Sequence, residues 1–211
     1  MLIQHSLSPL MGVWKIDESW QDMLEAFSNK DIYSTGVAEI RSEGRKQEWL
    51  AVRLLLKQML GFEACIEYKE NGAPFLPESI YNISISHTKG YAAVLLSENS
   101  APGIDIEYRS GRAWKLRGKY MGDDEMAMFS VPCSDRLPDC DTLATVCWCA
   151  KETAFKVLQQ VEVDFIKHLH ILPFTLSDKG KFLMKETKTL QQQEFYVNYQ
   201  VAEDYIITWK E

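Results

Sequence analysis

The stretch "ISISHTKGYAAVLLSENSAPGIDIEYRS", residues 83–110, contains the pattern that decides the fold. Two apolar, strand-like runs flank the turn-like "TKG", which predicts an antiparallel hairpin. The connector "SENSAPG" then leads into a further strand, "GIDIEY", at residues 103–108. We therefore expect a boundary between two halves of the chain within this connector.

The same order of elements occurs on both sides of this boundary. Each half contains a strand-like segment, a long helical pattern (residues 42–60 and 142–160) and then strands joined by short turns. Gly61 directly follows the first helical pattern, as expected at a helix C-terminus. The sequence predicts an α+β fold of two similar halves, 1–101 and 102–211, related by pseudo-two-fold symmetry. Each half places a long helix against a mainly antiparallel sheet.

The composition excludes several classes of protein. The 211 residues are 46% hydrophobic and 25% charged, which is ordinary for a globular protein. A net charge of -7 argues against non-specific binding of nucleic acid. No apolar run approaches the length of a membrane span, and the first residues lack the features of a signal peptide. We expect a cytoplasmic protein that has neither nucleic acid nor membrane as a partner.

Two acidic residues lie near the end of the strand at residues 103–108. Asp105 and Glu107 stand at positions i and i+2, so both carboxylates lie on the same face of the strand. Like charges this close repel each other unless a cation neutralises them, and Mg²⁺ is typically bound by one or two carboxylates together with phosphate oxygens and water. The pattern alone is equally compatible with two solvated acids at a strand end.

The second helical pattern contains "WCAKETAFK", residues 148–156. Glu152 and Lys156 stand at i and i+4 and therefore share a face of the helix. Their neighbours are mostly small or apolar, so the pair looks partly enclosed, and idle charges are costly in such surroundings. The alternative is an exposed ion pair that contributes a few tenths of a kcal/mol.

Cations gather at the start of the first helical pattern, where the helix macrodipole disfavours them. A bound anion would remove this conflict. Arg45, Trp49 and Arg53 follow one another at four-residue intervals and form one stripe. The alternative is a solvated basic stripe balanced by Glu43 and Glu48. The cations at the helix start are Arg41, Arg45 and Lys46, and Arg53 belongs only to the stripe.

Four segments together resemble a known family. "GIDIE" and "WCAKETAFK" resemble the GxDxE and WxxKEAxxK signatures of the 4′-phosphopantetheinyl transferases, in particular the two-domain monomeric type that activates peptide synthetases and other carrier proteins. "NISISHTKGYAAVL" and "GAPFLP" resemble the Ser-His and GKP segments of the same family. Two departures are Ala73, where many relatives have the GKP lysine, and Thr153, where a smaller Ala or Ser is usual.

The resemblance implies a reaction and a set of catalytic residues. Such enzymes transfer the phosphopantetheine arm of coenzyme A to a serine of an apo acyl or peptidyl carrier protein and release adenosine 3′,5′-bisphosphate. Asp105, Glu107 and Glu152 would bind Mg²⁺ against the pyrophosphate, with Asp105, Glu152 and Lys156 as the catalytic residues. Lys156 would neutralise the leaving bisphosphate, and Lys151 would support the same phosphates. Glu152 is also a candidate to accept the proton of the serine, directly or through a water.

The resemblance also implies how coenzyme A, the substrate, is bound. His87 matches the histidine that contacts the 3′-phosphate, although it could instead be an ordinary turn residue. Ala73 leaves one phosphate-binding cation missing, for which Arg41, Lys46 or Lys89 could compensate. The residues expected to bind the coenzyme are Arg41, Arg45, Lys46, Arg53, Ser86, His87, Thr88, Lys151 and Lys156.

A basic segment, "RSGRAWKLRGK" at residues 109–119, contains five cations and no acid. Carrier proteins served by this family are typically acidic around the serine, so complementary charge predicts docking here. The alternative is a solvated helix whose cations pair with Asp123, Asp124 and Glu125. The residues expected to contact the carrier are Arg112, Trp114, Lys115, Arg117 and Lys119.

Two other functions remain open. One is a different Mg²⁺-dependent nucleotide or phosphoryl transferase with the same acidic residues. The other is a catalytically degenerate relative that binds coenzyme A or a carrier protein, which only the Ala73 departure supports.

Overall fold

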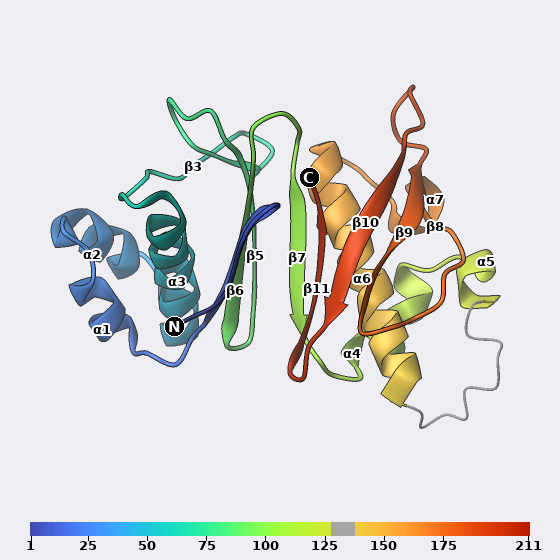
Figure 1. The fold of residues 1–211 in the computed structure, drawn as a ribbon, viewed down its shortest axis with the longest axis horizontal. Coiled ribbons are helices and arrows are strands. Elements are labelled where there is room, and N and C mark those ends of the chain that lie inside the picture. Colours follow the sequence, from blue (N-terminus) through green and yellow to red (C-terminus); the bar gives the residue numbers. More distant parts are fainter. Residues whose placement is uncertain (128–137) are drawn as a thin grey trace. The chain divides into compact units, whose positions relative to one another are not determined.

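The computed structural model describes residues 1–127 and 138–211. The chain divides into two compact units, Met1–Pro102 together with Glu211, and Gly103–Lys210. Each unit packs a long helix against an antiparallel sheet (Figure 1). The predicted α+β class is therefore confirmed.

The first unit is built on a four-stranded antiparallel sheet in the order β1-β2-β6-β5. Its strands are β1 (Leu2–Leu7), β2 (Leu10–Lys15), β5 (Asn82–Thr88) and β6 (Tyr91–Ser97). Three helices and a two-stranded ribbon complete it: α1 (Trp20–Glu25), α2 (Lys30–Ala38), α3 (Glu43–Leu60), β3 (Glu67–Tyr68) and β4 (Pro74–Phe75).

The hairpin predicted from the opening stretch is formed by β5 and β6. Ile83 pairs with Leu96 and Thr88 pairs with Tyr91. The turn between the strands contains Gly90 at φ +79°, a conformation that favours glycine. The hairpin thus places one end of β5 next to this turn.

Helix α3 begins and ends close to the predicted residues. The side chain of Ser42 accepts a hydrogen bond from the backbone N–H of Arg45, which caps the first turn. Gly61, in the left-handed conformation, ends the helix. The residues from Leu50 to Leu56 are buried, and the helix packs on β2 and β6. The N-terminal end of α3 is mostly exposed, with Arg41 and Arg45 exposed and Lys46 half-buried, whereas Arg53 lies in the buried stretch.

The second unit is built on a five-stranded antiparallel sheet in the order β7-β11-β10-β9-β8. Its strands are β7 (Gly103–Tyr108), β8 (Leu169–Ile171), β9 (Lys179–Glu186), β10 (Glu194–Val201) and β11 (Tyr205–Lys210). Its helices are α4 (Arg112–Leu116), the 3₁₀ helix η1 (Arg117–Lys119), α5 (Asp123–Met126), α6 (Pro138–Leu158) and α7 (Phe165–His168). Helix α6 packs on β7 and β11.

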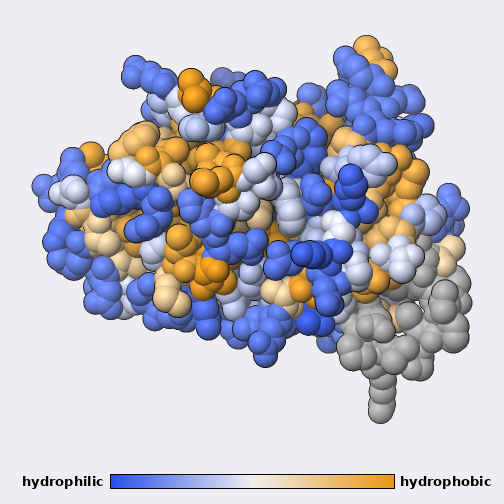
Figure 2. All heavy atoms as spheres, in the orientation of Figure 1, coloured by the Kyte–Doolittle hydropathy of each residue, from blue (hydrophilic) through white to orange (hydrophobic). Residues whose placement is uncertain are grey.

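Within residues 1–127 and 138–211, no helix is both long enough and apolar enough to traverse a bilayer. Figure 2 shows hydrophilic side chains over much of the visible face, with hydrophobic ones in separate groups.

Candidate active site

One face of strand β7 carries both acidic residues. Gly103, Asp105 and Glu107 lie at alternate positions, and all three face helix α6. A Cβ atom on Gly103 would lie 2.4 Å from the carbonyl oxygen of Thr153, so no other residue fits without moving the backbone. This close approach places the two carboxylates directly beside the helix.

Each acid of β7 has a partner on α6. The ammonium group of Lys156 donates to Oδ1 of Asp105 at 2.8 Å and to the carbonyl oxygen of Ile104 at 2.8 Å. The indole N–H of Trp148 donates to Oε1 of Glu107 at 3.1 Å. The Asp105 side chain is only 8% exposed, whereas that of Lys156 is 25% exposed. The acidic pair is therefore partly enclosed and not a solvated strand end.

Glu152 completes a cluster of three carboxylates and one ammonium group. Burial raises the pKa of Glu152 to about 7; the charges of Asp105 and Glu107 also raise it, and that of Lys156 lowers it. The sequence-predicted residues Asp105, Glu107, Glu152 and Lys156 thus lie together in the second unit. When all of them are ionised, the cluster has two negative charges in excess.

The chemistry of this cluster fits a hard divalent cation. All three acidic side chains offer carboxylate oxygens, the ligands that Mg²⁺ prefers, and a cation would balance their excess charge. Among the described residues, however, no three His, Cys, Asp or Glu side chains are already close enough to enclose a metal ion. Binding would therefore require the acidic side chains to shift, and Asp105 to share or release Lys156.

Lys151, the residue before Glu152, does not join this cluster. Its side chain is 0% exposed, and its ammonium group donates to Glu125 Oε2 at 2.6 Å and to the carbonyl oxygens of Tyr120 and Phe165 at 2.6 and 2.9 Å. These partners use all three ammonium protons. The expectation that Lys151 supports a phosphate is thus wrong in this geometry, because the group is buried and already satisfied.

In the first unit, Arg45 and His87 lie together. Nη1 of Arg45 is 3.3 Å from Nε2 of His87 and 3.2 Å from Oε2 of Glu48. Oε2 of Glu48 is also 3.2 Å from Nδ1 of His87. The structure therefore brings a predicted helix cation to the predicted histidine. Glu48, which contacts both, was considered only as a surface counter-charge and was missed as a member of this cluster.

The other residues expected to bind the coenzyme lie outside the Arg45–His87 cluster. Ser86 and Thr88 belong to strand β5 and alternate with His87, so their side chains lie on the opposite face of the strand.

The remaining cations of the first unit are engaged separately. Lys46 forms an ion pair with Glu43 at 2.7 Å and lies 4.7 Å from the ring centroid of Trp20. The guanidinium of Arg53 stacks 3.4 Å above the ring of Trp49, and burial lowers its pKa. Arg41 is exposed and precedes the helix cap. Within the predicted stripe, Arg53 therefore contacts Trp49, whereas Arg45 contacts Glu48 and His87.

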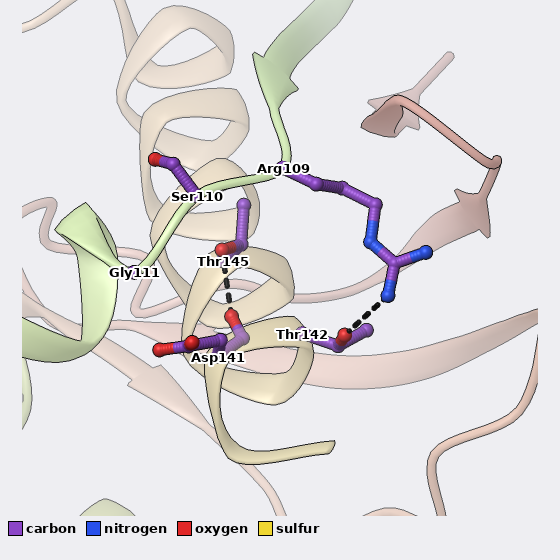
Figure 3. Close-up of a pocket in the computed structure, with 6 residues that line it drawn as sticks. All are labelled: Arg109, Ser110, Gly111, Asp141, Thr142 and Thr145. Atoms are coloured by element: carbon purple, nitrogen blue, oxygen red, sulfur yellow. Dashed lines mark hydrogen bonds between the residues drawn. The ribbon is translucent and has the colours of Figure 1, made fainter. Parts of the chain in front are cut away.

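The side chain of Arg109 is held in place by hydrogen bonds within the second unit. Its guanidinium donates to the hydroxyl of Thr142 at 2.9 Å (Figure 3). It also donates to the carbonyl oxygens of Ala202 and Glu203. Arg109 and Thr142 border a pocket of about 190 Å³, which is also lined by Asp141 and Thr145. Arg109 therefore ties the end of β7 to helix α6 and is not a free surface cation.

The other four cations of the basic segment have a different environment. Arg112, Lys115 and Lys119 are exposed, and the guanidinium of Arg117 stacks 3.8 Å from the ring of Trp114. Within the part of the chain that the structure describes, none of the four forms an ion pair. The alternative of internal pairing with the acidic residues of α5 is thus not realised, since Glu125 is buried against Lys151.

Comparison with known proteins gives consistent matches over both units. The model of the 4′-phosphopantetheinyl transferase N-terminal domain matches residues 39–97, and that of the 4′-phosphopantetheinyl transferase superfamily matches residues 101–210. The 4′-phosphopantetheinyl transferases AcpT of Escherichia coli O157:H7 and of strain K12 are each 39% identical to the chain over 83 residues. The match covers 38% of this chain and 43% of each relative, so it spans less than half of the relatives' length. The chain belongs to the 4′-phosphopantetheinyl transferase superfamily.

Proposed function

We propose that this protein is a Mg²⁺-dependent 4′-phosphopantetheinyl transferase. It transfers the 4′-phosphopantetheine group of coenzyme A to a serine of an apo carrier protein and releases adenosine 3′,5′-bisphosphate. The observation that carries the proposal is the cluster of three carboxylates and one ammonium group on β7 and α6. That cluster lies within the residues that match the superfamily model.

The carboxylates would bind the metal. Asp105, Glu107 and Glu152 are the side chains that would hold Mg²⁺, which when bound polarises the phosphoryl oxygens of the pyrophosphate. Without a cation, the three carboxylates repel one another, and the raised pKa of Glu152 expresses that repulsion together with its burial. The excess negative charge thus makes the cluster a receptor for a divalent cation.

Two side chains would act on the transferred group. In the reaction, the serine oxygen bonds to the phosphorus that carries the pantetheine, and the bond from that phosphorus to the leaving bisphosphate breaks. Lys156, held by Asp105 and by a backbone carbonyl, would stabilise the negative charge that develops on the leaving group. Glu152, with a pKa of about 7, would accept the serine proton directly or through a water.

The first unit would bind the 3′-phosphate of the coenzyme. Arg45, with 64% of its side chain exposed, lies beside His87, and both could donate to a phosphate oxygen. Glu48 now occupies part of their donor capacity, so phosphate binding would require that carboxylate to give way.

The carrier protein would dock on the basic segment. Its exposed cations, Arg112, Lys115 and Lys119, carry the charge that an acidic partner would complement. Trp114, stacked with Arg117, would supply an apolar centre for the contact. This surface consists of Arg112, Trp114, Lys115, Arg117 and Lys119.

Mass spectrometry of apo carrier proteins tests the proposal. Apo acyl and apo peptidyl carriers are incubated with the protein, coenzyme A and Mg²⁺, and each converted carrier gains the mass of one phosphopantetheine group. A carrier whose acceptor serine is replaced by alanine is the control. Coenzyme A binding with no mass gain on any carrier would contradict the proposal and identify a catalytically inactive binding module.

A further inference from the structure

The ion pair of Lys151 and Glu125 is buried in the second unit and has no part in the proposed chemistry. Besides Lys151, Glu125 accepts hydrogen bonds from the backbone N–H groups of Gly122 at 2.9 Å and Ile171 at 2.8 Å. Lys151 in turn binds the carbonyl oxygens of Tyr120 and Phe165. The pair therefore joins helix α6 to three other segments: residues 120–126, residue 165 and strand β8.

Residues of the first of these segments, together with Arg117, Gly118 and Ile166, line a groove of about 610 Å³ on the second unit. Met121 follows the carbonyl of Tyr120, Met126 follows Glu125, and Ile166 follows the carbonyl of Phe165. Three lining residues are thus direct chain neighbours of groups that the ion pair holds. The groove is lined chiefly by Arg117, Met121, Gly122, Asp123, Met126 and Ile166.

The groove is continuous with the basic segment, because Arg117 belongs to both. Methionine and isoleucine side chains favour an apolar occupant, and methionine adapts to varied shapes. The neighbouring cations favour an occupant whose surface is acidic. An apolar side chain on an acidic protein meets both conditions, and the proposed carrier protein has that chemistry.

We propose that Lys151 is a positioning residue for the carrier protein: with Glu125 it holds the walls of this groove, and the groove receives an apolar side chain of the carrier. The inference rests on the proposed function and names a second part of the carrier surface. Because Lys151 precedes Glu152 on α6, the same helix turn fixes both the groove and the carboxylate proposed to meet the carrier serine. Lys151 acts through the groove and does not touch the coenzyme.

Kinetics on two kinds of variant test this inference. Lys151→Met removes the ion pair, and Ile166→Asp, at a position 36% exposed, places an acid in the groove and leaves the pair intact. In both variants we expect the KM for apo acyl carrier protein to rise about tenfold or more, and the Kd for coenzyme A to stay within about twofold. Lys151→Met should also speed hydrogen exchange at the amides of Gly122 and Ile171.

A matched core variant separates positioning from general loss of stability. Val197→Ala, at a fully buried position on β10, should destabilise the unit without raising the carrier KM. A weaker coenzyme A affinity with an unchanged carrier KM in Lys151→Met would overturn the inference, as would an equal rise in carrier KM in Val197→Ala. If Lys151→Met does not fold, Ile166→Asp decides, and an unchanged carrier KM there rejects the groove. Failure of the wild type to modify any carrier would contradict the proposed function instead.

Discussion

Helix α6 contributes a lysine to each of two charged regions of the second unit. Lys151 and Lys156 each bind one carboxylate and at least one backbone carbonyl. Around Lys151 a single ammonium faces a single carboxylate, Glu125, and backbone groups satisfy the rest. Around Lys156 a single ammonium faces three carboxylates, with Asp105 bound directly and Glu152 nearby.

The difference shows how a structural pair can be told from a reactive one. A buried ion pair with balanced charge and complete hydrogen bonding needs nothing further, and it is costly mainly when one partner is removed. An enclosed cluster with unbalanced charge destabilises the folded protein and shifts the pKa of its members. Such pKa shifts are typical of functional sites. Burial alone would rank Lys151 as the more important lysine, whereas charge balance selects Lys156 for the chemistry.

The largest expected effect comes from removing one carboxylate in each region. Glu152→Gln should reduce the rate of transfer by about 10²–10⁴-fold, since it removes a proposed metal ligand and a candidate general base. Glu125→Gln should change kcat at saturating carrier by less than about tenfold. Carrier modification followed by mass spectrometry measures both. Equal losses in the two variants would break the comparison between the regions.

For stability, Lys151 should matter more than Lys156. Lys151→Met leaves a carboxylate buried without its partner and should lower the free energy of unfolding by about 3–5 kcal/mol. Lys156→Met, at a more exposed position, should lower it by about 1–2 kcal/mol. Urea denaturation at pH 7 without Mg²⁺ measures both values. A larger loss for Lys156→Met would contradict the assignment of Lys151 as the structural lysine.

The unbalanced charge of the cluster around Lys156 should make the stability of the protein depend on pH. Because the pKa of Glu152 is raised from 4.5 to about 7 on folding, its contribution to stability is fully present below about pH 4.5 and is lost as the pH rises to about 7. The metal-free protein should therefore lose about 2–3 kcal/mol over this range relative to Glu152→Gln. Mg²⁺ should stabilise the wild type more at pH 8 than at pH 6, since binding requires the ionised carboxylate.

Thermal unfolding with and without Mg²⁺ measures this effect. If the stability of the wild type and of Glu152→Gln depended on pH in the same way, the pKa of Glu152 would not be raised by folding, which would contradict the prediction.

An exposed ion pair in the first unit extends the comparison of the two charged regions to the protein surface. Arg45 and Glu48 form a surface pair, which contributes little to stability. Arg45→Ala should leave the Tm nearly unchanged but weaken coenzyme A binding about tenfold, because a charge-assisted contact to the 3′-phosphate is lost. Binding of dephospho-coenzyme A should change little. An unchanged preference for coenzyme A over dephospho-coenzyme A in this variant would place the 3′-phosphate elsewhere.

The smallest expected effect concerns a contact between α6 and the strand beside β7. The hydroxyl of Thr153 lies 2.6 Å from that of Thr208, the cross-strand neighbour of Asp105, and both residues are fully buried. Thr153→Ala should lower the free energy of unfolding by about 1 kcal/mol and leave transfer nearly unchanged. A large loss of activity in Thr153→Ala would show that this hydroxyl pair also positions Asp105.

The parts of the site that were predictable depend on local periodicity. Asp105 and Glu107 share a face because a strand alternates, and Glu152 and Lys156 share a face because a helix repeats. The long helices and the hairpin of residues 83–97 were likewise predicted from pattern and end signals. Strand β1 was not recognised, although it forms the edge of the first sheet.

The missed parts depend on contacts between residues distant in sequence. Lys151 and Glu125 are 26 positions apart, and no local pattern pairs them. One signal for the burial of Lys151 was present, since Cys147 and Ala154 at i−4 and i+3 are apolar and are both fully buried in the structure. A lysine within the apolar stripe of a helix indicates a structural partner before it indicates a ligand.

The close approach at Gly103 has a consequence for how such a protein can change over evolutionary time. Every missense change of a glycine codon adds at least one carbon, and here the first carbon would already lie 2.4 Å from a backbone oxygen. No conservative substitution therefore exists at this position, unlike a core position where one apolar side chain can replace another of similar size. Proteins that keep this helix and strand can change the surrounding side chains gradually. The backbone spacing between β7 and α6 at Gly103, which places the carboxylates beside Lys156, should stay constant.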